Sequence, residues 1–269
     1  MRLAALQMTS SDDVSANLQM ARDLVLEAAQ RGAQFAALPE NFAFMGKGEA
    51  DKLQVAENDG AGPIQAGLSS MARSSGIWLL GGTLPLKGTE ANRVHAASLL
   101  FSPAGERVAR YDKIHLFDVD VPGKSESHRE SRFIAPGSAP VVASTAVGRV
   151  GLAVCYDIRF PELFRRLASA GMDGFVLPSA FTAPTGRAHW ETLLRARAIE
   201  NQCWVVAPAQ SGFHANGRET YGDSMIVDHW GQVLARLPRG TGVVIADVDL
   251  HDQHRAREKF PALQHRKMD

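Results

Sequence analysis

The chain has 269 residues, and 45% of them are hydrophobic, which is enough to bury the core of one layered α/β domain over residues 1–269. Basic and acidic residues number 29 each, so the formal net charge of zero argues against nucleic acid or an anionic membrane as a partner. The sequence has no run of about 18 apolar residues, and its N-terminus turns polar too early for a signal peptide. These features predict a cytoplasmic protein.

Strand and helix patterns alternate through the first half of the chain. Residues 2–8 have the composition of a buried strand, and residues 14–31 have the apolar spacing of an amphipathic helix. A short strand over residues 34–38 follows, and a second helix begins at Pro63, a favourable first-turn residue. The strand IWLLGG comes next. This alternation is typical of an α/β fold.

The second half repeats this plan. The strand RVGLAVC, residues 149–155, precedes a helix that begins at Pro161, and the strand GFVLP follows that helix. The pattern G-x5-L-P-x-x-F occurs at Gly32 and again at Gly171, 139 residues later. Because the same order of elements accompanies both copies, the pattern suggests a duplicated unit.

A second pair of similar segments, residues 98–110 and 224–236, has the pattern of β-hairpins with glycine at the turn. Glycine and proline punctuate any α/β chain, so one match could arise by chance, but two in the same order favour an internal pseudo-repeat. Each half would form a sheet with helices on one face. Because the bare faces of the two sheets must be buried, we predict a four-layer α-β-β-α sandwich with its site at strand ends and the loops after them.

The two cysteines, Cys155 and Cys203, are too few for a disulfide framework. Cys155 lies between an apolar strand and a helix start, where a tight turn holds a side chain outward and the helix N-terminus stabilises a thiolate. The alternative is that Cys155 simply packs in the core, as free cysteines commonly do. Cys203 begins the apolar segment CWVVAPA, and there the packing interpretation is favoured.

A thiol with a pKa near 8.5 needs a base or a cation nearby. Glu40 follows an apolar strand and Pro39, where desolvation would raise its pKa and make it a base, although a glutamate that caps a turn is the commoner case. Lys113 stands between apolar neighbours and could be a fixed cation, although most lysines are solvated. Taken alone, Glu130 has the pattern of a solvated loop acid.

Motifs for metals and organic cofactors are absent. The sequence has no Walker A loop, no G-x-G-x-x-G fingerprint, no C-x-x-C and no H-E-x-x-H. His251 and His254 are close in sequence, but no further ligand accompanies them at zinc-like spacing. A solvated C-terminal segment is the favoured interpretation of these two histidines, and no metal site is predicted.

Three motifs in this order, LPE, YDKIHLF and GLAVCYDIRFPEL, resemble the nitrilase superfamily of carbon–nitrogen hydrolases, and so do PSAFT, AHWE, LRARAIE, YGDSM and DHWG. The resemblance covers nearly the whole chain and implies the same α-β-β-α sandwich, a small-molecule amide substrate and no cofactor. It also implies assembly into homodimers or larger homo-oligomers through helices near the cysteine and through the C-terminal tail.

The catalytic residues that the resemblance implies are Glu40, Lys113 and Cys155, with Glu130 as a second glutamate. In that mechanism Glu40 is the base, Lys113 and the backbone N–H after Cys155 hold the oxyanion, and Glu130 keeps Lys113 and the substrate in register. One position departs from the superfamily pattern: Asp223 stands where relatives commonly carry histidine in Y-G-H-S, which puts contacts near the pocket rim in doubt.

The candidate substrate-binding residues are Tyr156, Arg159, Phe181 and Thr182. Arg159 is suited to a bidentate pair with a substrate carboxylate, or else to a structural ion pair with Asp157 or Glu162. Phe181 and Thr182 follow the strand GFVLP and would line the pocket, or would serve as core and cap residues.

Three functions stay open. The first is an amidase that cleaves a peptide-like amide of an α-keto acid, and the second is an amidase for smaller α-keto acid amides. The third is a nitrilase-fold interaction module without turnover, which the retention of all four catalytic-type residues argues against.

Overall fold

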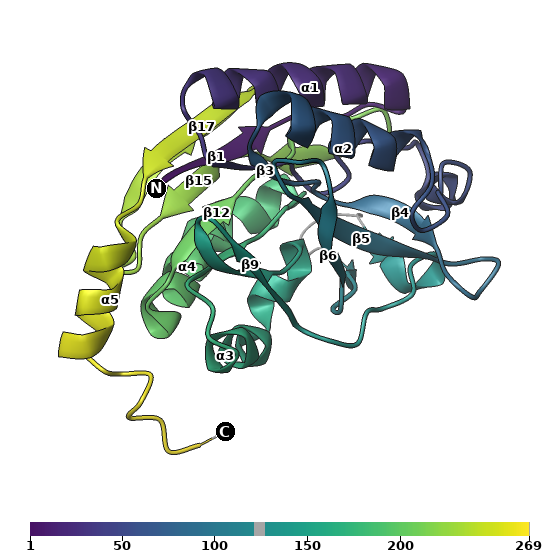
Figure 1. Ribbon diagram of the computed structural model, residues 1–269. Coiled ribbons are helices and arrows are strands. Elements are labelled where there is room, and N and C mark those ends of the chain that lie inside the picture. Colours follow the sequence, from purple (N-terminus) through teal and green to yellow (C-terminus); the bar gives the residue numbers. More distant parts are fainter. Residues whose placement is uncertain (121–126, 269) are drawn as a thin grey trace.

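The computed structural model describes residues 1–120 and 127–268, and two sheets lie between two layers of helices (Figure 1). Within these residues, no helix combines the length and the apolar character that crossing a bilayer requires. The α-β-β-α sandwich predicted from the sequence is confirmed.

The first sheet is built mainly from the first half of the chain, and α1 and α2 cover its outer face (Figure 1). Its parallel centre is β1–β2–β3, and β5 extends it with antiparallel neighbours β4 and β6. The bounds of these elements are β1 Arg2–Gln7, α1 Val14–Gln30, β2 Phe35–Ala37, α2 Pro63–Ser75, β3 Trp78–Leu80, β4 Leu84–Lys87, β5 Val94–Phe101 and β6 Arg107–Asp112.

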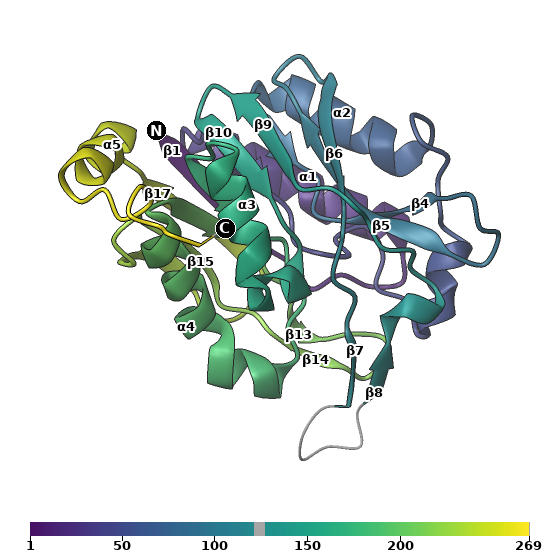
Figure 2. The same cartoon turned by 90° about the horizontal axis from the view of Figure 1, so that it is seen from below.

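The second sheet has the same plan, with α3 and α4 on the opposite outer face (Figures 1 and 2). Its parallel centre is β10–β11–β12, and β15 and β16 extend it on one side while β9 closes the other. The bounds are β9 Val141–Thr145, β10 Gly148–Leu152, α3 Pro161–Ser169, β11 Gly174–Val176, α4 Ala183–Asn201, β12 Trp204–Ala207, β15 Ser224–Val227 and β16 Val233–Leu237.

The predicted pseudo-repeat is therefore a structural one. Both segments with the hairpin pattern form hairpins, β5–β6 and β15–β16, and each follows a parallel trio of strands. The predicted strand over residues 149–155 is too long at its C-terminal end, because β10 ends at Leu152 and Cys155 begins a 3-10 turn.

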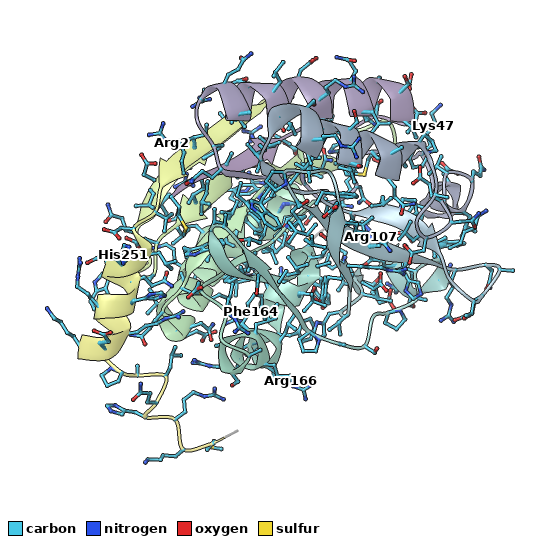
Figure 3. The ribbon with its side chains drawn as sticks, in the orientation of Figure 1. Arg2, Lys47, Arg107, Phe164, Arg166 and His251 are labelled. Atoms are coloured by element: carbon cyan, nitrogen blue, oxygen red, sulfur yellow. The ribbon has the colours of Figure 1, made fainter. Side chains whose placement is uncertain are left out.

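Alternation along β1 shows how the four layers are held together. Leu3 and Ala5 belong to the core shared with the second sheet, whereas Ala4 and Leu6 belong to the core under α1 and α2. Successive side chains of a strand point to opposite faces, so one strand contributes to two cores. Helices bury a single face instead: on α3, Phe164 points toward the sheet and Arg166 away from it (Figure 3).

Some elements form through pairing with strands that are distant in the sequence. β17 (Gly242–Asp247) comes from the C-terminal end but pairs antiparallel with β1 in the first sheet. α5 (Leu250–Lys259) follows it. Two small pairs of strands, β7 (Asp118–Asp120) with β8 (Ser127–Arg129) and β13 (Ser211–Phe213) with β14 (Glu219–Tyr221), lie at one end of the molecule (Figure 2).

Candidate active site

Three of the predicted residues stand just after strands. Glu40 lies three residues beyond β2, Lys113 directly follows β6, and Cys155 lies three residues beyond β10. Glu130 begins a 3-10 turn over Glu130–Arg132. Because β2 and β10 belong to different sheets, the sandwich brings residues from both halves of the chain to one end of the sheets.

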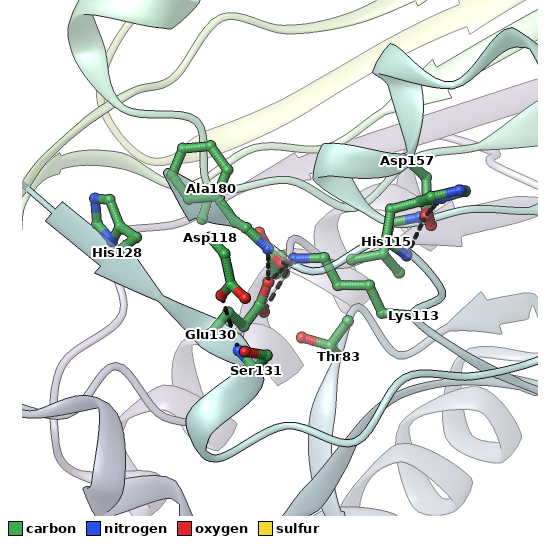
Figure 4. A network of polar contacts seen from close by, with 12 residues as sticks. Thr83, Lys113, His115, Asp118, His128, Glu130, Ser131, Asp157 and Ala180 are labelled. Carbon is green, nitrogen blue, oxygen red and sulfur yellow. Dashed lines mark hydrogen bonds and ion pairs between the residues drawn. The ribbon is translucent and has the colours of Figure 1, made fainter. Parts of the chain in front are cut away.

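Lys113 is the centre of a buried charge network (Figure 4). Its Nζ donates to Glu40 Oε1 at 2.8 Å and to both Glu130 carboxylate oxygens at 3.0 and 2.8 Å. The Lys113 side chain is only 2% exposed. Burial lowers its pKa, but the charges of Glu130 and Glu40 outweigh that effect and hold the pKa well above the ordinary value. Lys113 is therefore a fixed ammonium rather than a solvated one.

Glu130 is also fixed from the backbone. The Phe117 N–H donates to Glu130 Oε2 at 2.7 Å, in addition to the two contacts from Lys113. Burial raises the pKa of Glu130, but the charges of Lys113 and Lys52 and these hydrogen bonds bring it below the usual range. Glu130 is thus a carboxylate that holds Lys113, and the expectation of a solvated loop acid from its local sequence alone is wrong.

Cys155 occupies a sharp turn. Its φ is +46°, in the left-handed region that non-glycine residues seldom adopt, and its N–H donates to Pro178 O at 2.9 Å. Burial and the charge of Glu40 raise the pKa of the thiol, while Lys113 and a backbone hydrogen bond from Ala180 act in the opposite direction. Burial and the Glu40 carboxylate therefore favour the protonated thiol at rest.

Asp157 builds this turn. Its carboxylate accepts from the Val154 N–H at 2.8 Å, from Tyr111 Oη at 2.7 Å and from the His115 N–H at 3.1 Å. The side chain is completely buried. These contacts occupy Asp157, so it forms no ion pair with Arg159 in the described structure.

The predicted residues line one pocket. It contains about 510 Å³ of empty space, part of it open to solvent. Its lining includes all eight residues predicted from the sequence, namely Glu40, Lys113, Glu130, Cys155, Tyr156, Arg159, Phe181 and Thr182.

The candidate substrate contacts have defined neighbours. The Arg159 guanidinium carbon lies 5.9 Å from the Tyr156 ring centre and 5.4 Å from that of Phe181, and Nη1 contacts His189 Nδ1 at 3.3 Å. Within the described residues Arg159 pairs with neither Asp157 nor Glu162, so those structural alternatives are not realised. Phe181 and Thr182 both line the pocket. The ring centres of Phe181 and Trp190 lie 4.8 Å apart, and Thr182 occupies the N-cap position of α4 without a capping hydrogen bond from its side chain.

Sequence reasoning did not identify half of the lining. The additional residues are Asn41, Glu49, Lys52, Phe117, His128, Ala180, Thr185 and Arg218. Phe117 and Ala180 lie within motifs that carried the resemblance, so motif position could have indicated them. Nothing local marks Lys52 or Arg218, which reach the pocket from the 3-10 turn Glu49–Leu53 and from the β13–β14 connection.

Asp223 does not lie at the pocket rim, and the doubt about contacts there does not apply to it. Arg236 Nε donates to Asp223 Oδ1 at 2.9 Å, and Trp190 Nε1 donates to the Asp223 backbone oxygen at 2.8 Å. Asp223 is absent from the pocket lining. Its negative charge is matched by an arginine of the neighbouring strand β16, so the departure from the superfamily pattern is accommodated locally.

Two further features bear on chemistry. Cys203 is fully buried and lies before β12, in agreement with the packing interpretation. Across residues 1–120 and 127–268, no group of three or more histidine, cysteine, aspartate or glutamate side chains is arranged to hold a metal ion.

The sandwich and this pocket define an α/β protein with a cysteine beside a buried glutamate and lysine. The chain belongs to the carbon–nitrogen hydrolase family, whose profile matches residues 2–258. It is 43% identical over 266 residues to the deaminated glutathione amidase of Synechocystis sp., covering 98% of this chain and 97% of that protein. It is also 43% identical over 271 residues to the deaminated glutathione amidase of Homo sapiens, covering 99% and 82%.

A solved structure agrees with the fold. The crystal structure of the C. elegans NitFhit protein matches with a TM-score of 0.92 at 39% identity. That match covers 99% of this chain and 65% of the NitFhit chain.

Proposed function

We propose that this protein is a cysteine-dependent amidase that hydrolyses deaminated glutathione to 2-oxoglutarate and cysteinylglycine. The observation that carries the proposal is the buried Lys113 ammonium, which is held between the carboxylates of Glu40 and Glu130 on the wall of the pocket that contains Cys155. A base, a fixed cation and a thiol in one cavity are the groups that acyl transfer needs.

The first step forms the thioester. Cys155 transfers its proton to Glu40 as the sulfur attacks the amide carbonyl carbon, because the raised pKa keeps the resting thiol protonated. The carbonyl π electrons move to oxygen, where Lys113 and the backbone N–H after Cys155 stabilise the negative charge. Glu40 then gives its proton to the amide nitrogen, the C–N bond breaks, and the amine leaves.

The second step releases the acid. Water enters the position of the departed amine and gives a proton to Glu40 as it attacks the thioester carbon. The C–S bond breaks when the tetrahedral intermediate collapses, and the proton returns from Glu40 to the Cys155 sulfur. Glu130 keeps Lys113 in place throughout through its two contacts of 2.8 and 3.0 Å.

The choice of substrate rests on sequence likeness and on Arg159. The loop LPENFAFMG, the run RARAIENQCWVVAPAQSG and the tail FPALQHRK resemble the deaminated glutathione amidase branch, and the 43% identities point the same way. Arg159 lines the pocket without an acidic partner among the described residues, so its guanidinium is available for the carboxylate of the α-keto acid.

Omega-amidase, which acts on the smaller amide α-ketoglutaramate, is the second candidate, because that branch shares the CYDIRF motif that contains Cys155 and Arg159. The test is release of 2-oxoglutarate from deaminated glutathione and from α-ketoglutaramate, measured in parallel, with Cys155→Ala as the control. A higher kcat/KM for deaminated glutathione that Cys155→Ala abolishes supports the proposal.

A preference for α-ketoglutaramate would assign the protein to omega-amidase with the same chemistry. No turnover of either compound, together with no reaction of Cys155 with a thiol-specific label, would favour a non-catalytic interaction module.

We also propose a cytoplasmic location and a homodimer or larger assembly. Both cysteines are free and buried, which suits a reducing compartment. The aromatic side chains of Trp230 and Phe260 are 66% and 60% exposed near the C-terminal helix, as an interface between copies would require. Cell fractionation tests the first statement, and light scattering of the purified protein tests the second.

A further inference from the structure

The catalytic pocket continues into a second hollow. The outer hollow is lined by residues of β8, of the start of α4, of β13, β14 and their connection, and by Glu49 of the 3-10 turn Glu49–Leu53. Glu49, His128 and Arg218 line both cavities. Figure 2 shows the small strand pairs that carry most of this lining at the same end of the molecule. The outer hollow is therefore an extension of the site rather than a separate cavity.

Arg218 is distinguished among the cations of the two cavities. Lys113 is already engaged by Glu40 and Glu130, and the charge of Lys52 acts on Glu130 and Glu49. Arg159 lines the inner pocket but not the outer hollow. Among the described residues, Arg218 is the one lysine or arginine that lines both cavities.

The Arg218 guanidinium has hydrogen-bonding capacity left over. Its Nη2 donates to the backbone oxygen of Ala180, the residue whose backbone also bonds to Cys155. Its Nε is buried and has no hydrogen-bond partner in the described structure. A buried donor without an acceptor is costly, and a ligand carboxylate in the outer hollow would offset that cost by pairing with the guanidinium charge, since Arg218 lines both cavities.

We infer that the outer hollow receives the leaving amine of the substrate and that Arg218 binds the terminal carboxylate of that amine. This inference rests on the proposed function. Cys155 and Arg218 both line the inner pocket, and Arg218 also lines the outer hollow, so a leaving amine that extends from the scissile bond toward the outer hollow would reach Arg218. Ammonia, the leaving group of a simple amide, would not occupy this hollow.

Two acids line the outer hollow, Glu49 and Glu219, and each has a basic neighbour. The His128 ring lies 3.6 Å from the Glu49 carboxylate and offsets its charge when protonated, and Arg239 pairs with Glu219 at 3.7 Å. Arg159 serves the keto acid end of the substrate, so the two arginines would hold the two ends on either side of the scissile bond. Arg218 is then a specificity residue for dipeptide-like amides, whereas Arg159 serves every α-keto acid amide.

The experiment varies the substrate and the protein together. Kinetics are measured with deaminated glutathione, with its C-terminal carboxamide and with α-ketoglutaramate. We expect the wild-type protein to prefer the free acid over the carboxamide by roughly tenfold or more in kcat/KM. Arg218→Gln, which keeps a donor for Ala180 but removes the charge, should bring that ratio close to one, mostly through KM, and Arg218→Lys should restore part of it.

Arg31→Gln is the matched control, because Arg31 is an exposed arginine that pairs with Glu27 at 2.8 Å at the end of α1, outside both cavities. It should keep the wild-type ratio. Equal wild-type rates with the acid and the carboxamide would overturn the inference without any variant and would leave the proposed function standing. An equal loss on all three substrates in Arg218→Gln would also overturn it, since Arg218 would then be structural. Turnover of α-ketoglutaramate alone by the wild type would overturn the proposed substrate and the subsite together.

Discussion

The two halves of the molecule share a backbone plan but differ in what they place at equivalent strand ends. After β2 the sequence Leu38-Pro39 leads to Glu40, and after β11 the sequence Leu177-Pro178 leads to Ser179. Glu40 bonds to Lys113, whereas the buried Ser179 hydroxyl only donates to Leu177 O at 3.0 Å. The same turn is used once for a reactive group and once to satisfy the backbone.

The strands that begin each half show the reverse assignment. Cys155 lies three residues beyond β10, and Ser10 lies three residues beyond β1. Ser10 Oγ donates to Phe42 O at 2.8 Å and accepts from Gln210, whose Nε2 also donates to Glu40 O at 3.0 Å. The non-reactive Ser10 of this second pair therefore supports Glu40 of the first pair through Gln210, which teaches that the two halves share a backbone scaffold while their side chains divide the work of the site.

Replacement of Glu40, the reactive residue at the first pair of equivalent turns, should have the largest effect on catalysis. Glu40→Gln should lower kcat/KM by roughly 10³-fold, because the proton acceptor is lost. The same change should speed alkylation of Cys155 by iodoacetamide, since the Glu40 charge that helps to raise the thiol pKa is gone while Lys113 remains. Steady-state kinetics and a mass-spectrometric labelling rate measure the two effects.

Ser179→Ala, at the equivalent turn, is the control and should change kcat/KM by less than about threefold, as expected for a side chain that contacts no reacting group. Slower alkylation of Glu40→Gln would contradict the electrostatic account of the Cys155 pKa.

Removal of the shared cation should affect both rate and stability. Lys113→Met should lower kcat by roughly 10²–10³-fold and the free energy of unfolding by about 3–5 kcal/mol, because two buried carboxylates lose their partner. Arg110→Gln, in β6 just before Lys113 but in a partly exposed pair with Asp112, should cost less than about 1 kcal/mol.

The wild type and the Lys113→Met variant should differ in how their free energy of unfolding changes with pH. In the wild type the pKa of Glu130 is lowered, so its contribution to stability is present above the unfolded value of about 4.3 and is lost as pH falls. Without Lys113, burial raises the pKa of Glu130, so the variant should regain stability as the pH falls through that raised pKa toward the unfolded value. Urea unfolding at several pH values measures this, and a parallel decline of variant and wild type would contradict it.

Loss of Gln210, which supports Glu40 from the second half of the chain, should have a smaller effect on stability and kcat. Gln210→Ala leaves the Ser10 N–H and the Glu40 backbone oxygen without a buried partner, and we expect a loss of about 1–3 kcal/mol in stability and roughly tenfold in kcat. Gln253→Ala removes a similar buried glutamine, which bonds to Trp204 and Asp173 away from the pocket. It should lose stability alone, and an equal loss of kcat in both variants would count against a positioning role for Gln210.

The smallest expected effect concerns the two buried cysteines and the change of stability with pH under alkaline conditions. Burial raises the pKa of both thiols, that of Cys203 to about 12, above the unfolded value of about 8.5. Their contribution to stability is complete below pH 8.5 and is lost as pH rises, at about 1.4 kcal/mol per pH unit for each. Cys155→Ala and Cys203→Ala should each halve the alkaline slope of the unfolding free energy between about pH 9 and 10, although Cys155 alone is needed for turnover. An unchanged slope in either variant would contradict the raised pKa of that thiol.

Much of the fold could be predicted from the sequence because it depends on local patterns. Apolar spacing, Pro63 and Pro161 at helix starts, and glycine turns predict α1, α2, α3 and both long hairpins. The repeated pattern G-x5-L-P-x-x-F predicts two similar halves. The need to bury the uncovered face of each sheet predicts the four layers of the sandwich. The same patterns do not predict α4, because this helix buries residues such as Gly186, Arg197 and Asn201 and has no regular apolar stripe.

The sequence by itself determined the identity of the reactive groups, since Glu40, Lys113 and Cys155 follow recognisable strands and motifs. Only the tertiary structure decided that Lys113 is desolvated between two carboxylates, that Asp223 is neutralised by Arg236 away from the pocket, and that β17 completes the first sheet. The physical reason is that burial, charge pairing and strand pairing are set by residues far away in the chain. Arg218 shows this most clearly, because a loop lysine or arginine has no local mark of its neighbours, and only the packed sandwich brings it to the cysteine.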